Sequence, residues 1–234
     1  MAGILYGIGV GPGDPELLTI KAARVIASCD VIAAPGEDAR KSVAYQIAVQ
    51  AVPELAKKCC VGFPAPMTRD VAARKQAHQQ AANLLSGYLD EGCRVGVLNL
   101  GDVTVYASFL YLYRLIRERG YEAELINGVP SFCAAAARLG MGLVEDEEQL
   151  HVLSEPEQVP EGLALPGTKV IMKMGKHLGT VSQQLREGDF EVAMVERLGM
   201  SGERIFRDAG EIDGDAGYYS LMIVKDKKTD ETYE

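Results

Sequence analysis

The first half of the chain alternates short apolar runs with longer segments in which apolar residues recur at helical spacing. Strands joined by helices in this way form βαβ units, so the pattern predicts a largely parallel sheet with helices on both faces. The predicted strands are Ile4–Gly9, Val31–Ala34, Cys60–Phe63, Arg94–Leu100 and Glu122–Ile126. The predicted helices are Glu16–Ser28, Ser42–Ala51, Val71–Glu91 and Ala107–Arg119.

In the second half, shorter connections join the apolar runs, which favours a mixed or antiparallel sheet. The strands expected there are Gln149–Leu153, Lys169–Lys173, Glu191–Glu196, Glu203–Phe206 and Tyr218–Val224, and the helices are Phe132–Leu139 and Thr180–Glu187. Two segments lack a hydrophobic period. We expect Glu155–Pro166 to be an exposed connection and Lys225–Glu234 to be a charged tail.

A chain of 234 residues is long for one domain and short for two large ones. Together with the change of pattern, this length predicts an α/β protein with two lobes. We place the N-terminal α/β domain at residues 1–127 and the C-terminal mixed α/β domain at residues 128–234. We expect a ligand cleft between them.

Composition and charge narrow the classes of function. Apolar residues make up 47% of the chain and charged residues 24%, as in ordinary soluble proteins. No apolar run approaches the roughly 18 residues that span a bilayer, and we expect a cytoplasmic protein without a membrane partner. The net charge of −9 argues against nucleic-acid binding, which depends on basic residues.

The cysteines and histidines give no sign of a disulfide framework or a metal site. The five cysteines include no C-x-x-C pair, so we expect reduced thiols. None of the three histidines stands at ligand spacing from another histidine or a cysteine. We therefore expect that the protein itself holds no metal.

Three Gly-rich turns follow predicted strands and are the strongest functional signal. They are the segments 9–15 (Gly-Val-Gly-Pro-Gly-Asp-Pro), 101–106 (Gly-Asp-Val-Thr-Val-Tyr) and 127–132 (Asn-Gly-Val-Pro-Ser-Phe). Ligands of open α/β sheets bind outside the carboxyl ends of strands, so a site is expected at these turns. The first turn fails the dinucleotide-binding fingerprint, because its third glycine position falls on Pro12 or Asp14.

In their order along the chain, these segments resemble the tetrapyrrole methylases, the class III fold of S-adenosylmethionine-dependent methyltransferases. The resemblance runs from Gly7 to Val224 and includes Met174-Gly175, Val195-Glu196-Arg197 and Tyr218-Tyr219-Ser220-Leu221. Within that family, segments 131–140 and 150–153 are most similar to the C-20 methyltransferases of cobalamin biosynthesis. The resemblance implies S-adenosylmethionine as methyl donor, precorrin-2 or cobalt-factor II as tetrapyrrole substrate, and a homodimer.

The sequence departs from the family pattern at several positions. Val103 and Asn127 replace a usual proline, and Pro130 replaces a serine or threonine. Pro35 lies where relatives of the siroheme pathway have an aspartate implicated in proton transfer. That subfamily is therefore disfavoured.

The resemblance also implies site residues. By matching motif positions, we expect the cofactor to bind Pro12, Gly101, Asp102, Val103, Val105, Tyr106, Pro130, Ser131, Phe132, Met174, Gly175, Leu198, Tyr219 and Ser220. The candidate acceptors of the C-20 proton are Asp102, Tyr106 and Lys176. A basic rim for the substrate carboxylates is expected at Arg69, Arg74, Lys75, Arg138 and Lys176.

Two alternatives remain open at this point. The first is a methylase of the same fold that acts at another corrin carbon, or on a protein side chain as the diphthine-forming enzymes do. The second is a protein that binds a tetrapyrrole or nucleotide without catalysis. Turnover with a labelled methyl donor separates the second from both enzymes.

Overall fold

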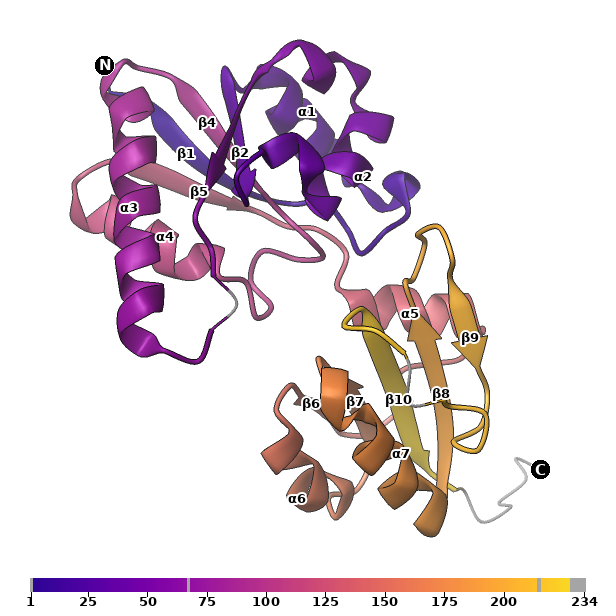
Figure 1. Ribbon diagram of the computed structural model, residues 1–234. Helices are drawn as coiled ribbons and strands as arrows, with labels where there is room; N and C mark the ends of the chain where they lie inside the picture. Colours follow the sequence, from indigo (N-terminus) through magenta and orange to yellow (C-terminus); the bar gives the residue numbers. More distant parts are fainter. Residues whose placement is uncertain (1, 67, 214–215, 228–234) are drawn as a thin grey trace. The chain divides into compact units, whose positions relative to one another are not determined.

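The computed structural model describes residues 2–66, 68–213 and 216–227. The chain divides into two compact units, Met1–Pro130 and Ser131–Glu234. Each unit is built on its own five-stranded sheet (Figure 1). The cleft expected between two domains stays a prediction.

The first sheet is entirely parallel, as predicted. Its strands are β1 (Ile4–Gly9), β2 (Val31–Pro35), β3 (Cys59–Phe63), β4 (Arg94–Asn99) and β5 (Glu122–Ile126), in the order β3-β2-β4-β1-β5. All five strands point the same way, so their carboxyl ends lie along one edge of the sheet. The three Gly-rich turns therefore leave the sheet at that edge.

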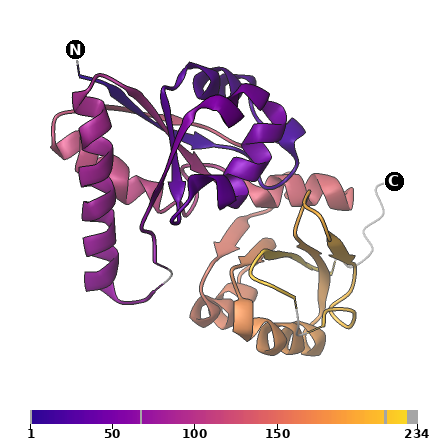
Figure 2. The ribbon, with the colours of Figure 1, turned by 45° about the horizontal axis from the view of Figure 1, so that its top comes forward.

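Helices cover both faces of this sheet (Figures 1 and 2). They are α1 (Ile20–Ser28), α2 (Val43–Ala51), α3 (Val71–Asp90) and α4 (Phe109–Glu118), with short 3-10 turns η1 (Pro15–Leu17), η2 (Ala39–Lys41) and η3 (Pro53–Lys57). The α3 and α4 helices pack on the face that carries Leu5, Val95 and Val97. On the opposite face, Gly96 lies against Ile8 and the end of α1 at Cys29.

One predicted helix of this unit is wrong in part. The expected continuous helix Glu16–Ser28 is divided into η1 and α1. Thr19 has extended backbone angles, and its side chain accepts a hydrogen bond from the Ala22 amide at 3.1 Å. A threonine in this conformation is a helix N-cap, which explains why α1 begins at Ile20.

The second sheet is mixed, as predicted. Its strands are β6 (Leu150–Leu153), β7 (Thr168–Met172), β8 (Phe190–Glu196), β9 (Arg204–Phe206) and β10 (Ser220–Asp226), in the order β6-β7-β10-β8-β9. Only the β6–β7 pair is parallel among these strands. The helical elements are α5 (Ser131–Leu139), η4 (Pro156–Gln158), α6 (Val159–Leu163), η5 (Gly175–His177) and α7 (Leu178–Glu187).

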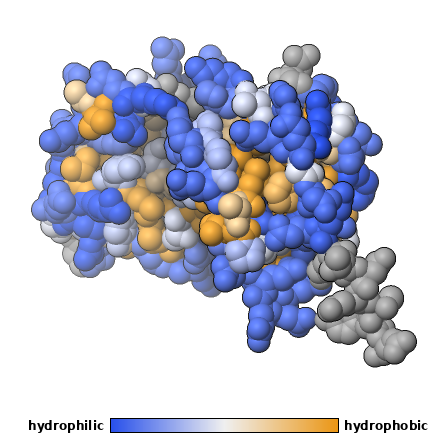
Figure 3. Space-filling model, turned by 90° about the horizontal axis from the view of Figure 1, so that it is seen from below, coloured by the Kyte–Doolittle hydropathy of each residue, from blue (hydrophilic) through white to orange (hydrophobic). Residues whose placement is uncertain are grey.

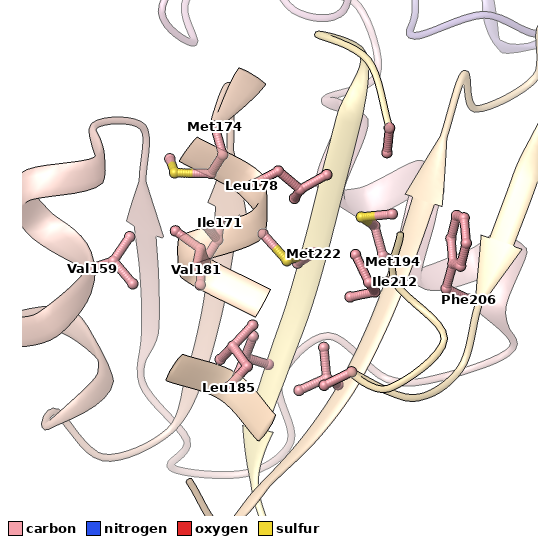
Figure 4. Close-up of a cluster of buried hydrophobic side chains, with 14 of the residues drawn as sticks. Val159, Ile171, Met174, Leu178, Val181, Leu185, Met194, Phe206, Ile212 and Met222 are labelled. Carbon is pink, nitrogen blue, oxygen red and sulfur yellow. The ribbon is translucent and has the colours of Figure 1, made fainter. Parts of the chain in front are cut away.

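Separate apolar clusters cover the two faces of the second sheet. On one face, Ala135 and Leu139 of α5 pack against Val170, Val195 and Ile223. On the other, residues of α6 and α7 pack against β7, β8, β9 and β10 (Figure 4). Both faces are therefore buried within this unit.

Two predictions for the second unit are wrong. Glu155–Pro166 is not a plain exposed connection, because it contains η4 and α6, and Val159 is fully buried in the apolar cluster. Burial of one valine side chain stabilises by roughly 1.5–3 kcal/mol, enough to order a short helix without a clear period. Lys225 and Asp226 belong to β10 and not to a tail; the rest of the expected tail beyond Lys227 lies outside the described residues.

Exposed apolar side chains interrupt an otherwise largely hydrophilic surface on the face shown in Figure 3. Among the helices of residues 2–66, 68–213 and 216–227, none is both long enough and apolar enough to cross a membrane. Within the same ranges, no three His, Cys, Asp or Glu side chains are grouped to hold a metal ion.

Candidate functional site

The three Gly-rich turns of the first unit meet at the carboxyl ends of β1, β4 and β5. A Cβ atom on Gly128 would lie 2.3 Å from the Gly101 carbonyl oxygen and 2.7 Å from the Gly9 carbonyl carbon. A Cβ on Gly9 would lie 2.6 Å from the Gly128 nitrogen. These contacts leave no room for a side chain. Gly9 and Gly128 are thus required for the backbones of the three turns to touch.

Backbone hydrogen bonds join the first two turns. Gly101 donates to the Gly11 carbonyl at 2.8 Å, and Gly11 donates to the Gly101 carbonyl at 3.2 Å. Val10 donates to the Asn99 carbonyl at 2.9 Å, which extends the β1–β4 pairing past the strand ends. Pro12 is buried directly after this bridge. The first turn therefore has a fixed outline.

Asp102 ties the second turn to the third. Its Oδ1 accepts bonds from the Thr104 amide at 2.7 Å and from the Thr104 hydroxyl. Its Oδ2 accepts from the Gly128 amide at 2.9 Å and from the Asn127 side-chain amide at 3.3 Å. Because a proline could not donate the last bond, the departure at Asn127 adds a contact to Asp102.

The environment of Asp102 favours its charged form. Burial alone would raise the pKa of this carboxyl group, but the hydrogen bonds from Thr104, Gly128 and Asn127 outweigh it and hold the pKa below its usual value. A carboxylate with a lowered pKa is a weaker base than an ordinary aspartate. The geometry supports a positioning role for Asp102, and its role as proton acceptor stays a prediction.

The other predicted residues of this turn differ in exposure. Val103 is fully buried in the core between the sheet and α3 and α4, and its contact with the donor stays a prediction. Val105 is half-buried. Tyr106 is 48% exposed and has a φ of 50°, a conformation that bulky residues rarely adopt. Strained residues of this kind occur often at functional sites.

The second unit gathers its predicted residues at one edge of its own sheet. Both β7 and β8 run antiparallel to β10, so their carboxyl ends lie beside the amino end of β10. In register, Leu221 faces Met172 and Ser220 faces Glu196. The Arg197 amide donates to the Tyr219 carbonyl at 2.9 Å just beyond the strands. The same edge of the sheet therefore holds Met174-Gly175, Leu198 and Tyr219-Ser220.

Each of these residues has a different environment. Met174 is 3% exposed and packs with Leu178 in the apolar cluster shown in Figure 4, so its side chain belongs to the core. Phe132 lies at the start of α5, and Leu198 follows β8. Both pack on the face of the second sheet that α5 covers. Pro130 and Ser131 are half-buried just before and at the start of α5. Tyr219 is 40% exposed.

Two cationic residues at this edge, which were not among the predicted site residues, have positive φ. Lys173 has a φ of 65° and Arg197 a φ of 53°, and they follow β7 and β8. Burial lowers the pKa of Lys173, and the charge of Glu155 partly opposes this shift. Positive φ at a lysine or arginine has no sequence signature, since glycine, asparagine and aspartate are the residues expected there.

The first unit also contains a pocket that the sequence did not predict. It has a volume of about 590 Å³ and opens where β2 and β3 end. Gly36, Phe63 and Pro64 line it, together with Ala73 and Gln76 of α3. Because the first sheet is parallel, this pocket lies along the same edge as the three Gly-rich turns.

The expected basic rim is distributed over both units. Arg69, Arg74 and Lys75 are exposed around the start of α3, whose Ala73 and Gln76 line the pocket. Arg138 pairs with Glu203 at 2.7 Å, which offsets its charge. Lys176 is exposed in η5.

Two curated relatives match nearly the whole chain. The chain is 32% identical over 225 residues to the probable cobalt-precorrin-2 C(20)-methyltransferase of Methanocaldococcus jannaschii, covering 94% of this chain and 95% of the relative. It is 31% identical over 232 residues to the cobalt-precorrin-2 C(20)-methyltransferase of Salmonella typhimurium, covering 96% of this chain and 97% of the relative.

A solved structure shares the fold. The uroporphyrin-III C-methyltransferase of Thermus thermophilus, in complex with S-adenosylhomocysteine, matches with a TM-score of 0.68 at 21% identity, covering 95% of this chain and 97% of the other. The sequence model of the family described as Tetrapyrrole (Corrin/Porphyrin) Methylases matches residues 4–213. With this match over most of its length, the chain belongs to the tetrapyrrole methylase family.

Proposed function

We propose that this protein transfers a methyl group from S-adenosylmethionine to C-20 of a precorrin-2-type tetrapyrrole, in its metal-free or cobalt-loaded form. The observation that carries the proposal is the match of both relatives, whose names specify this carbon, over at least 94% of the chain. Both names also specify the cobalt-loaded substrate, which favours that form.

Each unit has a glycine with open space beside its backbone. At Gly101 a Cβ would meet only the Val129 carbonyl oxygen, at 4.0 Å, and at Gly175 it would meet nothing within 4 Å. Both glycines have positive φ, 71° and 48°. Open space beside a bare backbone allows a ligand to approach closely. We expect the donor to contact backbone of this kind.

S-adenosylmethionine brings an activated methyl group, so the protein needs no nucleophilic side chain. The pyrrole nitrogens of the substrate supply electron density to the bridging carbon. The contribution of the protein is alignment of the reacting atoms and exclusion of water, and alignment can supply on the order of 7–11 kcal/mol. The fixed turns held by Asp102 fit that task.

The pocket beside β2 and β3 supports a place for the tetrapyrrole. Apolar groups of Phe63, Pro64 and Ala73 can contact the ring, and Arg69 and Arg74 stand near the start of the same helix for its carboxylates. A local basic cluster attracts an anionic ligand even in a protein of negative net charge.

We also propose a homodimer in the cytoplasm, as the family resemblance implies. Light scattering coupled to gel filtration measures the mass in solution. A mass of one 25.2 kDa chain at micromolar concentration would contradict the dimer.

The direct test is product analysis under anaerobic conditions. The purified protein is incubated with S-adenosylmethionine carrying a ¹³C-labelled methyl group and, separately, with precorrin-2 or cobalt-factor II. We expect one added methyl group by mass spectrometry, placed at C-20 by NMR. Methylation at a different carbon would move the protein to another branch of the family. Donor binding without transfer to either substrate would refute the substrate assignment.

A further inference from the structure

A buried carboxylate at the end of β8 has no role in the site described so far. Glu196 is 6% exposed and is the last residue of the strand. Its Oε2 accepts a bond from the Arg204 Nε at 2.6 Å, and its Oε1 accepts from the Gly217 amide at 2.6 Å. Burial alone would raise the pKa of Glu196, but these partners outweigh it and lower the pKa. The side chain is therefore charged, and each of its two oxygens accepts a hydrogen bond.

The partners of Glu196 are themselves fixed. Arg204 of β9 also pairs with Asp213, at 2.8 Å from Nη1 to Oδ2, and its guanidinium lies 5.2 Å from the centre of the Phe206 ring. The Gly217 carbonyl accepts the Ser220 hydroxyl at 2.5 Å. Glu196 thus links β8 and β9 to the segment that enters β10.

That segment carries two predicted donor-binding residues, Tyr219 and Ser220. The Tyr219 carbonyl accepts the Arg197 amide directly after Glu196, and the Tyr219 ring meets the Tyr218 ring edge-on at 5.4 Å. Tyr218 and Tyr219 are both exposed, so packing alone does not hold them. Besides the strand pairing and the Arg197 bond, this segment is tied to β8 at Gly217, whose amide donates to Glu196 and whose carbonyl accepts the Ser220 hydroxyl.

From this geometry we infer that Glu196, acting through Arg204 and Gly217, is a positioning residue that holds the Tyr219-Ser220 turn in the shape that binds the methyl donor. The inference rests on the proposed function. A positioning residue lowers the entropy lost on binding, because the turn is ordered before the ligand arrives.

The test is binding of S-adenosylhomocysteine to the full chain, measured by calorimetry for wild type, Glu196→Gln, Arg204→Gln and the double variant. We expect each single variant to raise Kd at least tenfold. The double variant should bind S-adenosylhomocysteine no more weakly than either single variant, because all three lose the same ion pair between Glu196 and Arg204. Hydrogen exchange of the peptide covering residues 216–221 should become faster in each variant.

Asp226→Asn is the matched control. Asp226 also accepts a bond from a glycine amide, Gly167, at 3.0 Å and pairs with a cation, Lys169, but it lies at the opposite end of β10. This variant should leave both Kd and the exchange of residues 216–221 unchanged. An equal loss of binding in Asp226→Asn would indicate general destabilisation and overturn the inference.

Removal of one partner of a buried ion pair can unfold a protein, so circular dichroism accompanies each variant. If Glu196→Gln does not fold, Arg204→Lys replaces it, because lysine keeps the charge but not the fork geometry. If hydrogen exchange of residues 216–221 becomes faster in the variants but their Kd stays within twofold of wild type, the inference is overturned and the proposed function stands. Absence of binding by folded wild type would instead overturn the proposed function, and the inference with it.

Discussion

Asp102 accepts four hydrogen bonds, and two of its partners, Asn127 and Gly128, belong to a different turn. An aspartate has about four acceptor sites, so the carboxylate is saturated. Asp102, one of the three residues that the sequence suggested as acceptor of the C-20 proton, is therefore engaged mainly in holding the two turns. Its charge matters because it holds two turns together.

The variant Asp102→Asn, studied at neutral and acidic pH, tests whether the charge of Asp102 holds the two turns together. The amide cannot accept from all four donors, and loss of bonds to a charged group costs roughly 1.5–3 kcal/mol of unfolding free energy. Because the folded pKa is lowered, wild-type Asp102 stabilises the fold above its unfolded pKa of about 3.9 and loses this contribution as pH falls through the folded pKa. Urea unfolding from pH 7 to pH 3 should show the difference between the proteins shrinking below about pH 4. A difference independent of pH would contradict this account.

At the scale of elements, the strand ends of the first sheet depend on glycine. The backbone contacts among Gly9, Gly101 and Gly128 join β1, β4 and β5 beyond their last ladder bonds. A further close approach occurs inside the sheet, where a Cβ on Gly7 would lie 2.0 Å from the Phe109 ring of α4. α4 and β1 pack closely there because Gly7 has no side chain.

Gly128→Ala should separate the turns. Its Cβ would meet backbone atoms that cannot move independently, so we expect a loss of roughly 1–3 kcal/mol of stability, as for overpacked cores, and at least tenfold weaker binding of S-adenosylhomocysteine. Gly87→Ala is the control, because Gly87 lies in α3 with nothing within 4 Å of its Cβ position. That variant should gain about 0.5–1 kcal/mol and bind normally. Thermal unfolding and calorimetry measure both effects, and normal binding by folded Gly128→Ala would contradict the role of the close contact.

At the scale of the whole molecule, an acidic protein is proposed to bind a polycarboxylate. The net charge of −9 repels such a substrate, so a basic cluster near the pocket has to overcome it. Arg69, Arg74 and Lys75 form that cluster around the start of α3. Interactions of this kind weaken with salt, since the Debye length falls to about 8 Å at physiological ionic strength.

Charge reversal of Arg69 and Arg74 to glutamate should raise the KM for the tetrapyrrole several-fold and leave kcat nearly unchanged. The KM of wild type should also rise with salt, more steeply than that of the variant. Reversal of Arg24 and Arg117, which are exposed on α1 and α4, changes the net charge equally and serves as control. Steady-state kinetics at several salt concentrations measure these effects. An unchanged KM in the Arg69 and Arg74 variant would remove the rim assignment.

The sequence by itself determined the sheet types and most elements of this protein. Buried parallel strands are continuous apolar runs, and glycine and proline mark their ends, so local pattern was sufficient. It failed at Thr19, where a capping threonine divides a helix, and at Val159, where tertiary burial orders a segment without a period. The family followed from the order of the motifs along the chain.

The tertiary structure alone decided which of these residues meet. The contact of Gly9 with Gly128, the saturation of Asp102 and the hydrogen bonds of Glu196 join residues far apart in the chain. The pattern of apolar and polar residues shows the period of each strand or helix. It does not show which residues from different strands meet at the edge of a sheet. For the same reason the sequence did not show that the Met174 side chain packs in the core, because its burial depends on α7 and neighbouring strands that its own motif does not contain.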